Sequence, residues 1–317
     1  IGSLDGNFYA INAQNGKEKW RFATKNNAPI LSSAVVFKGR VFFVGNDQML
    51  YALDAASGKL GWKALSTVGG GKDYDSGPSP TVVAGVVFCN GKEGLKGYDP
   101  ENGKVVWDGR GKRAGLGVYA LSYHPAGFLI NGGGSAYPGA INLRIAKGQG
   151  RVGGVGGDTF SLSAACDEKY AYVAGGSGLH KVLLTESQPK KGIAGTTKFT
   201  YKDKNWNNMH PHFSAIGADK KNVYIGEIDG CLHAVNIETG KLSWKFQTGD
   251  TVRSGPSIAG DIVYVGSEDG NLYAIDVTTG KEQWKFKTDG KITYSSPWIG
   301  DGVVYIGSAD GYVYALE

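Results

Sequence analysis

The chain has 317 residues, a formal net charge of +5 and 51 glycines. This glycine content is roughly twice the average and shows no collagen period, so it indicates many tight turns between aromatic-rich strands. No apolar run of about 18 residues exists, which excludes a membrane-spanning helix in this sequence. Basic and acidic residues are mixed along the chain, so we expect no nucleic-acid surface.

The chain opens at Ile1 without a signal-peptide pattern, so we expect upstream residues to have been removed. Its three cysteines, Cys89, Cys166 and Cys231, are far apart and form neither a CxxC nor a CxxCH motif. The cysteine pattern therefore favours neither structural zinc, nor c-type haem, nor a disulfide framework.

Along the chain, one segment recurs five times without gaps. The copies are AINAQNGKEKW (Ala10 to Trp20), ALDAASGKLGW (Ala52 to Trp62), GYDPENGKVVW (Gly97 to Trp107), AVNIETGKLSW (Ala234 to Trp244) and AIDVTTGKEQW (Ala274 to Trp284). Consecutive copies are about 40 to 45 residues apart, except for one gap of about three periods. We therefore expect two further units, without the tryptophan, between Trp107 and Trp244.

Each unit is predicted to form four strands, because hydrophobic residues alternate in runs such as VVYIGS and NLYAID between turn signals. Asp-Gly within Ser3 to Gly6, Ser267 to Gly270 and Ser308 to Gly311 favours a tight hairpin between the second and third strands. A Thr-Gly-Lys-like turn follows the third strand. The preceding Asp54, Asp99 or Asp276 can accept hydrogen bonds from its amides.

Four-stranded units of this kind bury their faces by stacking radially around an axis, which predicts an all-β fold, a β-propeller of antiparallel blades. We expect residues 1–317 to form one propeller domain, with partial repeats at its two ends meeting where the ring closes. Residues 1–24 supply the end of a second strand, a third and a fourth, and residues 292–317 supply a first, second and third strand. Eight blades are favoured, with seven as the alternative.

The five tryptophan segments resemble the PQQ-like repeat propellers, whose tryptophan-docking pattern is A-x-D-x-x-T-G-K-x-x-W. The resemblance covers residues 1–112 and 213–317 well. It implies an extracytoplasmic protein, periplasmic or at the cell surface. It also implies that the pattern's tryptophans pack against backbone of the neighbouring blade and hold the blades together, namely Trp20, Trp62, Trp107, Trp244 and Trp284.

Two branches of that family bear on function. Quinoprotein alcohol dehydrogenases hold PQQ and calcium on the propeller axis, whereas the lipoprotein of the outer-membrane barrel-assembly machinery and kinase-attached sensor domains are non-catalytic. The enzymes are nearly twice as long as this chain and carry an adjacent-cysteine pair, which is missing here. We therefore expect a non-catalytic binding or scaffold propeller for a protein, polymer or small ligand, without a cofactor. The alternatives are a PQQ-dependent oxidoreductase and a sensor or lectin-like domain of a larger protein.

The first strand of each blade lines a propeller's channel, so variable residues beside it are candidate binding positions. The residue before the Ser-Ser-Pro-like step is Leu31, Asp75, Tyr119, Phe160, His212, Arg253 or Tyr294 in the successive units. This polar ring suits an anionic or hydroxylated ligand, or a loop of a partner. An ordinary water-filled channel explains it equally well.

The irregular stretch from Arg113 to His212 adds His124, Trp206 and His210 to the candidates, because its repeat decays and unusual side chains collect there. Specialised binding blades and simple sequence drift explain this equally well. His210 and His212 flank a proline and lack helical metal-ligand spacing, so we predict no metal site.

Overall fold

The computed structural model describes residues 1–66, 79–91, 94–108, 121–124, 128–131, 139–142, 149–151, 164–175, 178–186, 193–203 and 214–317. Within these ranges the chain is built from β-strands and one short 3-10 turn, η1 (Lys25–Asn27). No helix of the described residues is long and apolar enough to cross a membrane. The all-β prediction is therefore confirmed.

Six sheets have four antiparallel strands in chain order, and we number them blades 1 to 6. Blade 1 has β3 (Val35–Phe37), β4 (Arg40–Val44), β5 (Met49–Asp54) and β6 (Leu60–Leu65); blade 2 has β7 (Thr81–Val83), β8 (Val86–Gly91), β9 (Gly94–Tyr98) and β10 (Val105–Asp108). Blade 3 has β11 (Leu121–His124), β12 (Phe128–Asn131), β13 (Gly139–Asn142) and β14 (Gln149–Arg151); blade 4 has β15 (Ala165–Cys166), β16 (Tyr170–Gly175), β17 (Gly178–Glu186) and β18 (Ile193–Tyr201). Blade 5 has β19 (Gly217–Ala218), β20 (Asn222–Gly226), β21 (Cys231–Asn236) and β22 (Leu242–Gln247); blade 6 has β23 (Ser257–Ala259), β24 (Ile262–Gly266), β25 (Asn271–Asp276) and β26 (Glu282–Lys287). Blades 3 and 4 are the two units expected between Trp107 and Trp244.

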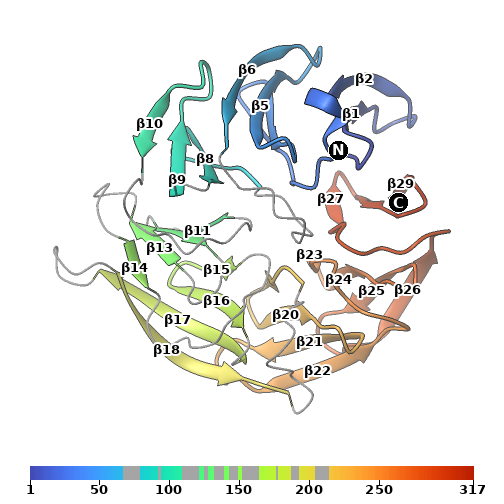
Figure 1. The fold of residues 1–317 in the computed structure, drawn as a ribbon. Coiled ribbons are helices and arrows are strands. Elements are labelled where there is room, and N and C mark those ends of the chain that lie inside the picture. Colours follow the sequence, from blue (N-terminus) through green and yellow to red (C-terminus); the bar gives the residue numbers. More distant parts are fainter. Residues whose placement is uncertain are drawn as a thin grey trace.

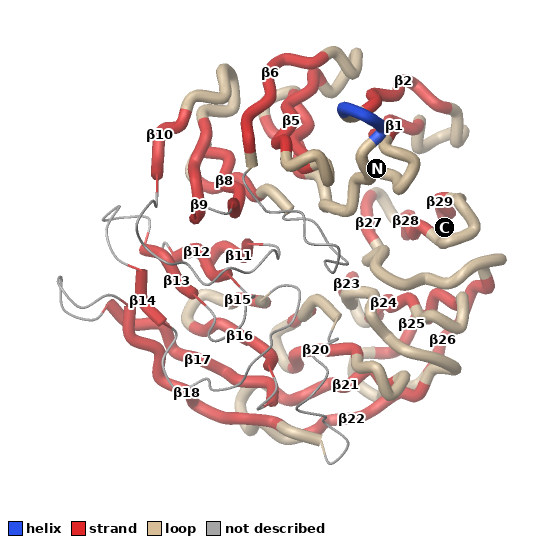
Figure 2. The backbone as a smooth tube through the Cα atoms, in the orientation of Figure 1, coloured by secondary structure: helices blue, strands red, loops and turns tan. Residues whose placement is uncertain are grey.

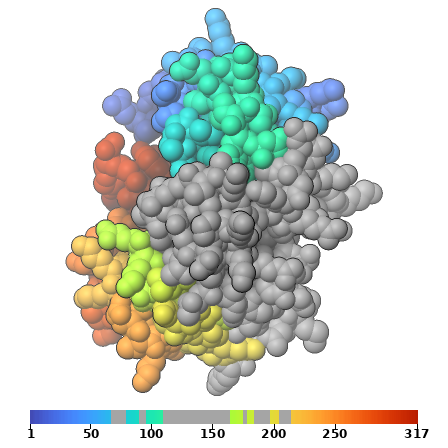
Figure 3. Space-filling model, turned by 90° about the vertical axis from the view of Figure 1, so that its left-hand side faces the viewer, coloured from blue at the N-terminus to red at the C-terminus, as the bar shows by residue number. Residues whose placement is uncertain are grey.

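The chain ends form two smaller sheets. The N-terminal sheet pairs β1 (Asn7–Ile11) with β2 (Glu18–Ala23), and Gly2 adds a single bridge to Phe8. The C-terminal sheet contains β27 (Trp298–Gly300), β28 (Val303–Gly307) and β29 (Val313–Leu316). Figure 1 shows the two sheets side by side, and in Figure 3 the C-terminal residues (red) border the N-terminal ones (blue).

The predicted blade count is wrong. The propeller has six four-stranded blades rather than eight or seven. Each terminal repeat supplies too few strands for a complete blade, and no hydrogen-bonded ladder joins β29 to the N-terminal sheet in the described structure. The partial repeats therefore stay separate sheets instead of sharing one blade.

The sheets are arranged around an axis, as the tube in Figure 2 shows. The first strand of each blade contacts the first strand of the next, from β3 and β7 through to β23 and β27. These short strands form the inner wall, and hydrophobic layers fill the space between blades. Between blades 5 and 6, for example, Tyr224, Leu232, Val263 and Val265 are fully buried in one cluster.

Local turn chemistry agrees with the sequence pattern. In the turns between second and third strands, Gly6, Gly230, Gly270 and Gly311 have φ between 81° and 89°, a region that favours glycine. In the turns between third and fourth strands, Asp54 Oδ1 accepts the amide of Ser57 at 2.8 Å, and Asp276 Oδ1 accepts that of Thr279 at 2.7 Å. Both kinds of predicted turn are present.

Three tryptophans each make one hydrogen bond to the following blade. Trp20 Nε1 donates to Ala55 O at 3.2 Å, Trp62 Nε1 to Pro100 O at 2.9 Å, and Trp244 Nε1 to Val277 O at 2.9 Å. Each acceptor lies in the turn between the third and fourth strands. A glycine of the same turn faces the indole so closely that an added Cβ would lie 2.6 to 2.7 Å from the ring, as at Gly58, Gly103 and Gly280. The turn must therefore carry glycine both for its positive φ and for its contact with the indole.

Blade 4 makes the equivalent contact with two other residues. Phe199 pairs with Lys181 in the ladder, as Trp244 pairs with Ala234, and it packs against the turn glycine Gly240. A phenyl ring has no donor, but Lys181 Nζ donates to Ile237 O at 2.7 Å. Ile237 occupies the position of Val277 in its own turn. Lysine and phenylalanine together thus supply the donor and the ring that one indole supplies elsewhere.

We predict that Trp62→Phe lowers the free energy of unfolding by about 1 kcal/mol, because Pro100 O loses its donor. Trp284→Phe is the matched control. Trp284 is 38% exposed, and no hydrogen bond of its Nε1 to a described residue is found, so we expect a change below about 0.5 kcal/mol. Urea unfolding of both variants checks this, and equal losses would contradict the docking role.

A second prediction concerns blade 4. Lys181→Ala should cost about 1 to 3 kcal/mol, because the partly buried Ile237 carbonyl loses its donor. Adding Phe199→Trp recreates the alanine and tryptophan pair of the other blades and should recover most of the loss. A double-mutant cycle measures this coupling. Additive effects of the two substitutions would show that the pair does not replace the indole.

Candidate functional site

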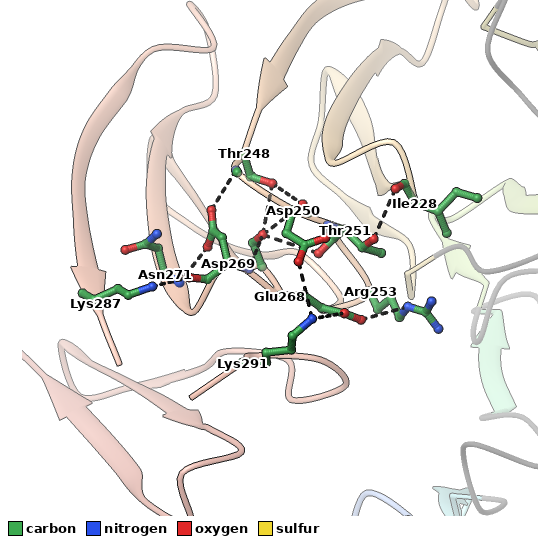
Figure 4. A network of polar contacts seen from close by, with 12 residues as sticks. Ile228, Thr248, Asp250, Thr251, Arg253, Glu268, Asp269, Asn271, Lys287 and Lys291 are labelled. Carbon is green, nitrogen blue, oxygen red and sulfur yellow. Dashed lines mark hydrogen bonds and ion pairs between the residues drawn. The ribbon is translucent and has the colours of Figure 1, made fainter. Parts of the chain in front are cut away.

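A group of interacting polar side chains lies on one face of the ring, beside blades 5 and 6. Three connections meet there, namely residues 248–256 between β22 and β23, residues 267–270 between β24 and β25, and residues 288–297 between β26 and β27. Hydrogen bonds join these connections to one another and to the blade 5 turn that contains Ile228. Glu268 N donates to Thr251 O at 2.9 Å, and Thr251 Oγ1 donates to Ile228 O at 3.2 Å (Figure 4).

Four charged residues on this face form what we call the rim cluster: Asp250, Arg253, Glu268 and Lys291. Glu268 contacts both cations, with Oε1 3.0 Å from Arg253 Nε and Oε2 3.2 Å from Lys291 Nζ. Lys291 Nζ also lies 3.4 Å from Asp250 Oδ2. In Figure 4 the Glu268 carboxylate lies between the two basic side chains. The charges alternate in sign along the rim.

Burial and orientation distinguish the members of the rim cluster. The Glu268 side chain is 15% exposed, whereas that of Lys291 is 57% exposed. The Arg253 Nε proton has no aligned acceptor among the described residues, so its contact with Glu268 is ionic. Hydrogen bonding to Glu268 raises the pKa of Lys291, and the Thr251 amide holds the pKa of Asp250 below its usual value. Both shifts favour the charged forms of Lys291 and Asp250, and the lysine is presented to solvent.

Two predicted binding residues are brought together here. Arg253 Nη1 donates to Tyr294 Oη at 3.2 Å, although the two residues belong to successive repeats. This pairing places a guanidinium and a phenol just before the first strands β23 and β27. Such a pair can bind a carboxylate or a hydroxyl group of a ligand.

The other predicted binding residues remain predictions. Those that lie outside the described residues are Asp75, Tyr119, Phe160, Trp206, His210 and His212. His124 ends strand β11, but its side chain also lies outside the described part. Leu31 is partly buried and has no polar atom in its side chain.

Sequence reasoning missed a second polar cluster, which lies in blade 5. In four other repeats a tyrosine on the third strand donates to the aspartate of the preceding turn, with Tyr9 to Asp5, Tyr51 to Asp47, Tyr273 to Asp269 and Tyr314 to Asp310. In blade 5 this tyrosine is replaced by His233, and the serine of the Ser-x-Asp-Gly turn is replaced by Glu227. Aligning the repeats reveals the replacement, because residues 227–233 read EIDGCLH where residues 267–273 of blade 6 read SEDGNLY.

The two replacements face each other in the interior. His233 is 0% exposed and Glu227 is 3% exposed, and His233 Nε2 lies 3.8 Å from Glu227 Oε1. His233 Nδ1 is 3.0 Å from Tyr201 Oη, at the end of blade 4. Burial raises the pKa of Glu227 to about 8, with a further contribution from Asp229, and burial lowers the pKa of His233 to about 4. Both side chains are therefore largely neutral in this environment at pH 7.

Asp229 and Cys231 complete this second cluster. A ring nitrogen of His233, the Cys231 sulfur and a carboxylate oxygen of Asp229 all lie within 4.8 Å of one another. Cys231 is buried, which raises the pKa of its thiol to about 11. Lys245 Nζ lies 3.1 Å from Asp229 Oδ2. The cluster thus combines thiol, imidazole and carboxylate groups at one blade boundary.

Comparison with known proteins identifies similar chains. A family model described as outer membrane protein assembly factor BamB matches residues 1–117 and 200–317. The crystal structure of BamB from Moraxella catarrhalis is similar with a TM-score of 0.72 at 20% identity, covering 99% of this chain and 90% of that one. Quinohemoprotein alcohol dehydrogenase from Comamonas testosteroni reaches 0.70 at 17% identity, covering 99% of this chain and 69% of that one. These structures share the fold.

Curated sequence relatives match only in part. Quinohemoprotein alcohol dehydrogenase ADH IIB of Pseudomonas putida is 33% identical over 114 residues, which is 31% of this chain and 16% of that enzyme. Quinohemoprotein alcohol dehydrogenase ADH-IIG of the same organism is 30% identical over 115 residues, again 16% of the enzyme. The matched segment is thus a small part of each dehydrogenase.

For the rim cluster we predict that Glu268→Gln lowers the free energy of unfolding by about 1 kcal/mol, because two cations lose the half-buried carboxylate between them. Glu282→Gln is the control. Its pair with Lys285, at 3.7 Å, lies on the surface and should contribute less than about 0.5 kcal/mol. Urea unfolding at low salt compares the two, and an equal effect of both substitutions would contradict a stabilising role of the cluster.

Proposed function

This chain belongs to the family described as outer membrane protein assembly factor BamB, and on that premise we propose that it is a non-catalytic scaffold. Its rim and channel would hold a protein partner in an extracytoplasmic compartment. The observation that carries the proposal is the rim cluster, an ordered set of charged side chains presented beside the inner strands. The partner we propose is a protein of outer-membrane assembly.

The rim cluster has the properties of a recognition surface. Hydrogen bonds hold the backbone of the three connections in place. Few loop residues would therefore have to become ordered when a partner binds. Alternating charges select partners with the complementary pattern and disfavour others, because like charges placed together at an interface cost several kcal/mol. Arg253 and Tyr294 are residue types that contribute strongly to protein interfaces.

The groups of the rim cluster also favour binding over catalysis. Its carboxylates and basic groups are engaged in ion pairs with one another, whereas a general acid or base must be within hydrogen-bond reach of the proton that it transfers. The described rim contains no nucleophile activated by a neighbouring base. Recognition of a charged partner is the activity that these side chains support best.

The scaffold proposal predicts a specific loss of binding. Arg253→Gln with Lys291→Gln removes both rim cations and should reduce capture of outer-membrane assembly proteins from membrane extracts at least tenfold. Lys241→Gln with Lys281→Gln makes the same charge change on the exposed turns that follow the third strands, and should leave capture unchanged. Quantitative mass spectrometry of cross-linked complexes measures both variants. Equal capture by the two variants would reject the rim as the binding surface.

The second candidate function is a PQQ-dependent oxidoreductase, and the matched segments of the quinohemoprotein dehydrogenases favour it. If the chain binds PQQ with calcium, a concentration of 100 times the dissociation constant stabilises it by about 2.7 kcal/mol. Thermal melting with PQQ and calcium distinguishes this candidate from the scaffold. An unchanged melting temperature would rule out the oxidoreductase.

A further inference from the structure

The buried cluster of blade 5 contains polar atoms that lack hydrogen-bond partners among the described residues. Glu227 Oε1 and His233 Nε2 are both buried, and neither has a hydrogen-bond partner among the described residues. Leaving two such atoms unpaired costs free energy comparable to a lost hydrogen bond for each atom. The repeats with serine and tyrosine at these positions avoid this cost, because Tyr273 Oη donates to Asp269 and Ser267 Oγ donates to Asp250 O.

The distance between the two unpaired atoms is informative. At 3.8 Å they are too far apart for a hydrogen bond. Two ligands of one tetrahedral zinc ion, each about 2.1 Å from the metal, lie about 3.4 Å apart. The Glu227 and His233 atoms are therefore within about half an ångström of the separation that a shared metal ion requires.

Three further features complete a ligand set. The i, i+2, i+4 spacing of Asp229, Cys231 and His233 starts in the turn and continues along β21, so that alternate side chains share one face of the strand. Their ligand atoms lie within 4.8 Å of one another. These three residues offer a carboxylate, a sulfur and an imidazole, and Glu227 adds a second carboxylate beside the imidazole. Sulfur and imidazole ligands together suit zinc rather than calcium or magnesium.

The surroundings also fit a metal ligand. Metal-binding histidines usually donate their second ring N–H to a neighbouring acceptor, and Tyr201 Oη lies 3.0 Å from His233 Nδ1. With the proton on Nδ1, the lone pair of Nε2 is free and lies 3.8 Å from Glu227 Oε1. Coordination to a dication would deprotonate the Cys231 thiol. Lys245 beside Asp229 opposes cation binding and limits the affinity.

We propose that Asp229, Cys231 and His233, with Glu227 beside the histidine, form a binding site for a divalent transition metal, zinc in particular, at the boundary between blades 4 and 5. This is the boundary where Phe199 and Lys181 replace the tryptophan. The ion would tie the turn of blade 5 to β21 and, through the hydrogen bond of His233 to Tyr201, to blade 4. The site is independent of the rim cluster and of the proposed scaffold function.

The test uses a variant that the protein's own repeats supply. Cys231→Asn with His233→Tyr converts DGCLH to DGNLY, the sequence of blade 6, where Tyr273 and Asp269 are hydrogen-bonded. This variant should fold, because the segment DGNLY already occupies the equivalent position in blade 6. Cys89→Ser is the control for loss of a buried cysteine in another blade.

The purified, reduced full chain is equilibrated with zinc chloride, freed of unbound metal and analysed for metal content. We expect one zinc per chain for the wild type and the Cys89→Ser control, and at least a tenfold weaker affinity for the double variant. Cobalt(II) should give the wild type a thiolate charge-transfer band that the double variant lacks. Chelation should lower the melting temperature of the wild type and of the Cys89→Ser control, but not that of the double variant. Equal zinc content in the wild type and the double variant, or a cobalt complex without the thiolate band, would overturn the proposal.

Discussion

The arrangement of this propeller depends on one contact between successive blades: an aromatic ring on the fourth strand packs on the turn glycine of the next blade while a nearby donor satisfies a carbonyl of that turn. Trp20, Trp62 and Trp244 provide ring and donor together. The same geometry is kept in blade 4 by Phe199 and Lys181. The turn thus needs a hydrogen-bond donor for its carbonyl and an aromatic ring against its glycine, and different side chains can supply them.

A scaffold held together at these turns leaves the opposite face of the ring free to vary. The turns between second and third strands and the loops between blades meet there, and they carry the rim cluster and the blade 5 cluster. Equivalent positions hold serine and tyrosine in blade 6 but Glu227 and His233 in blade 5. Two chemically different sites are thereby built on one repeated backbone. The rim cluster presents ion pairs at the surface, whereas the Glu227 and His233 side chains of the blade 5 cluster are buried. Charged recognition suits the former and metal coordination suits the latter.

Two departures from the repeat meet at the boundary between blades 4 and 5: the loss of the docking tryptophan, and the replacement of serine and tyrosine by Glu227 and His233. The tryptophan is absent there, Lys181 is buried beside the Tyr170 ring at 4.1 Å, and Tyr201 reaches His233 across the boundary. A cation in the interior requires such partners, because burying an unpaired charge is costly. This boundary therefore depends on polar contacts, whereas the boundary between blades 5 and 6 depends on the indole of Trp244.

The sequence alone determined the all-β fold, four strands per unit, the turn types and the family, because alternation, Asp-Gly turns and the tryptophan spacing are local signals repeated several times. It also singled out Arg253 and Tyr294, but not their contact. The number of complete blades, the exchange of tryptophan for Phe199 with Lys181, and the meeting of Glu227 with His233 were decided by tertiary structure. Each depends on which strands pair at the chain ends or on which side chains neighbouring blades bring together. Such contacts join residues far apart in the chain and leave no periodic trace in it.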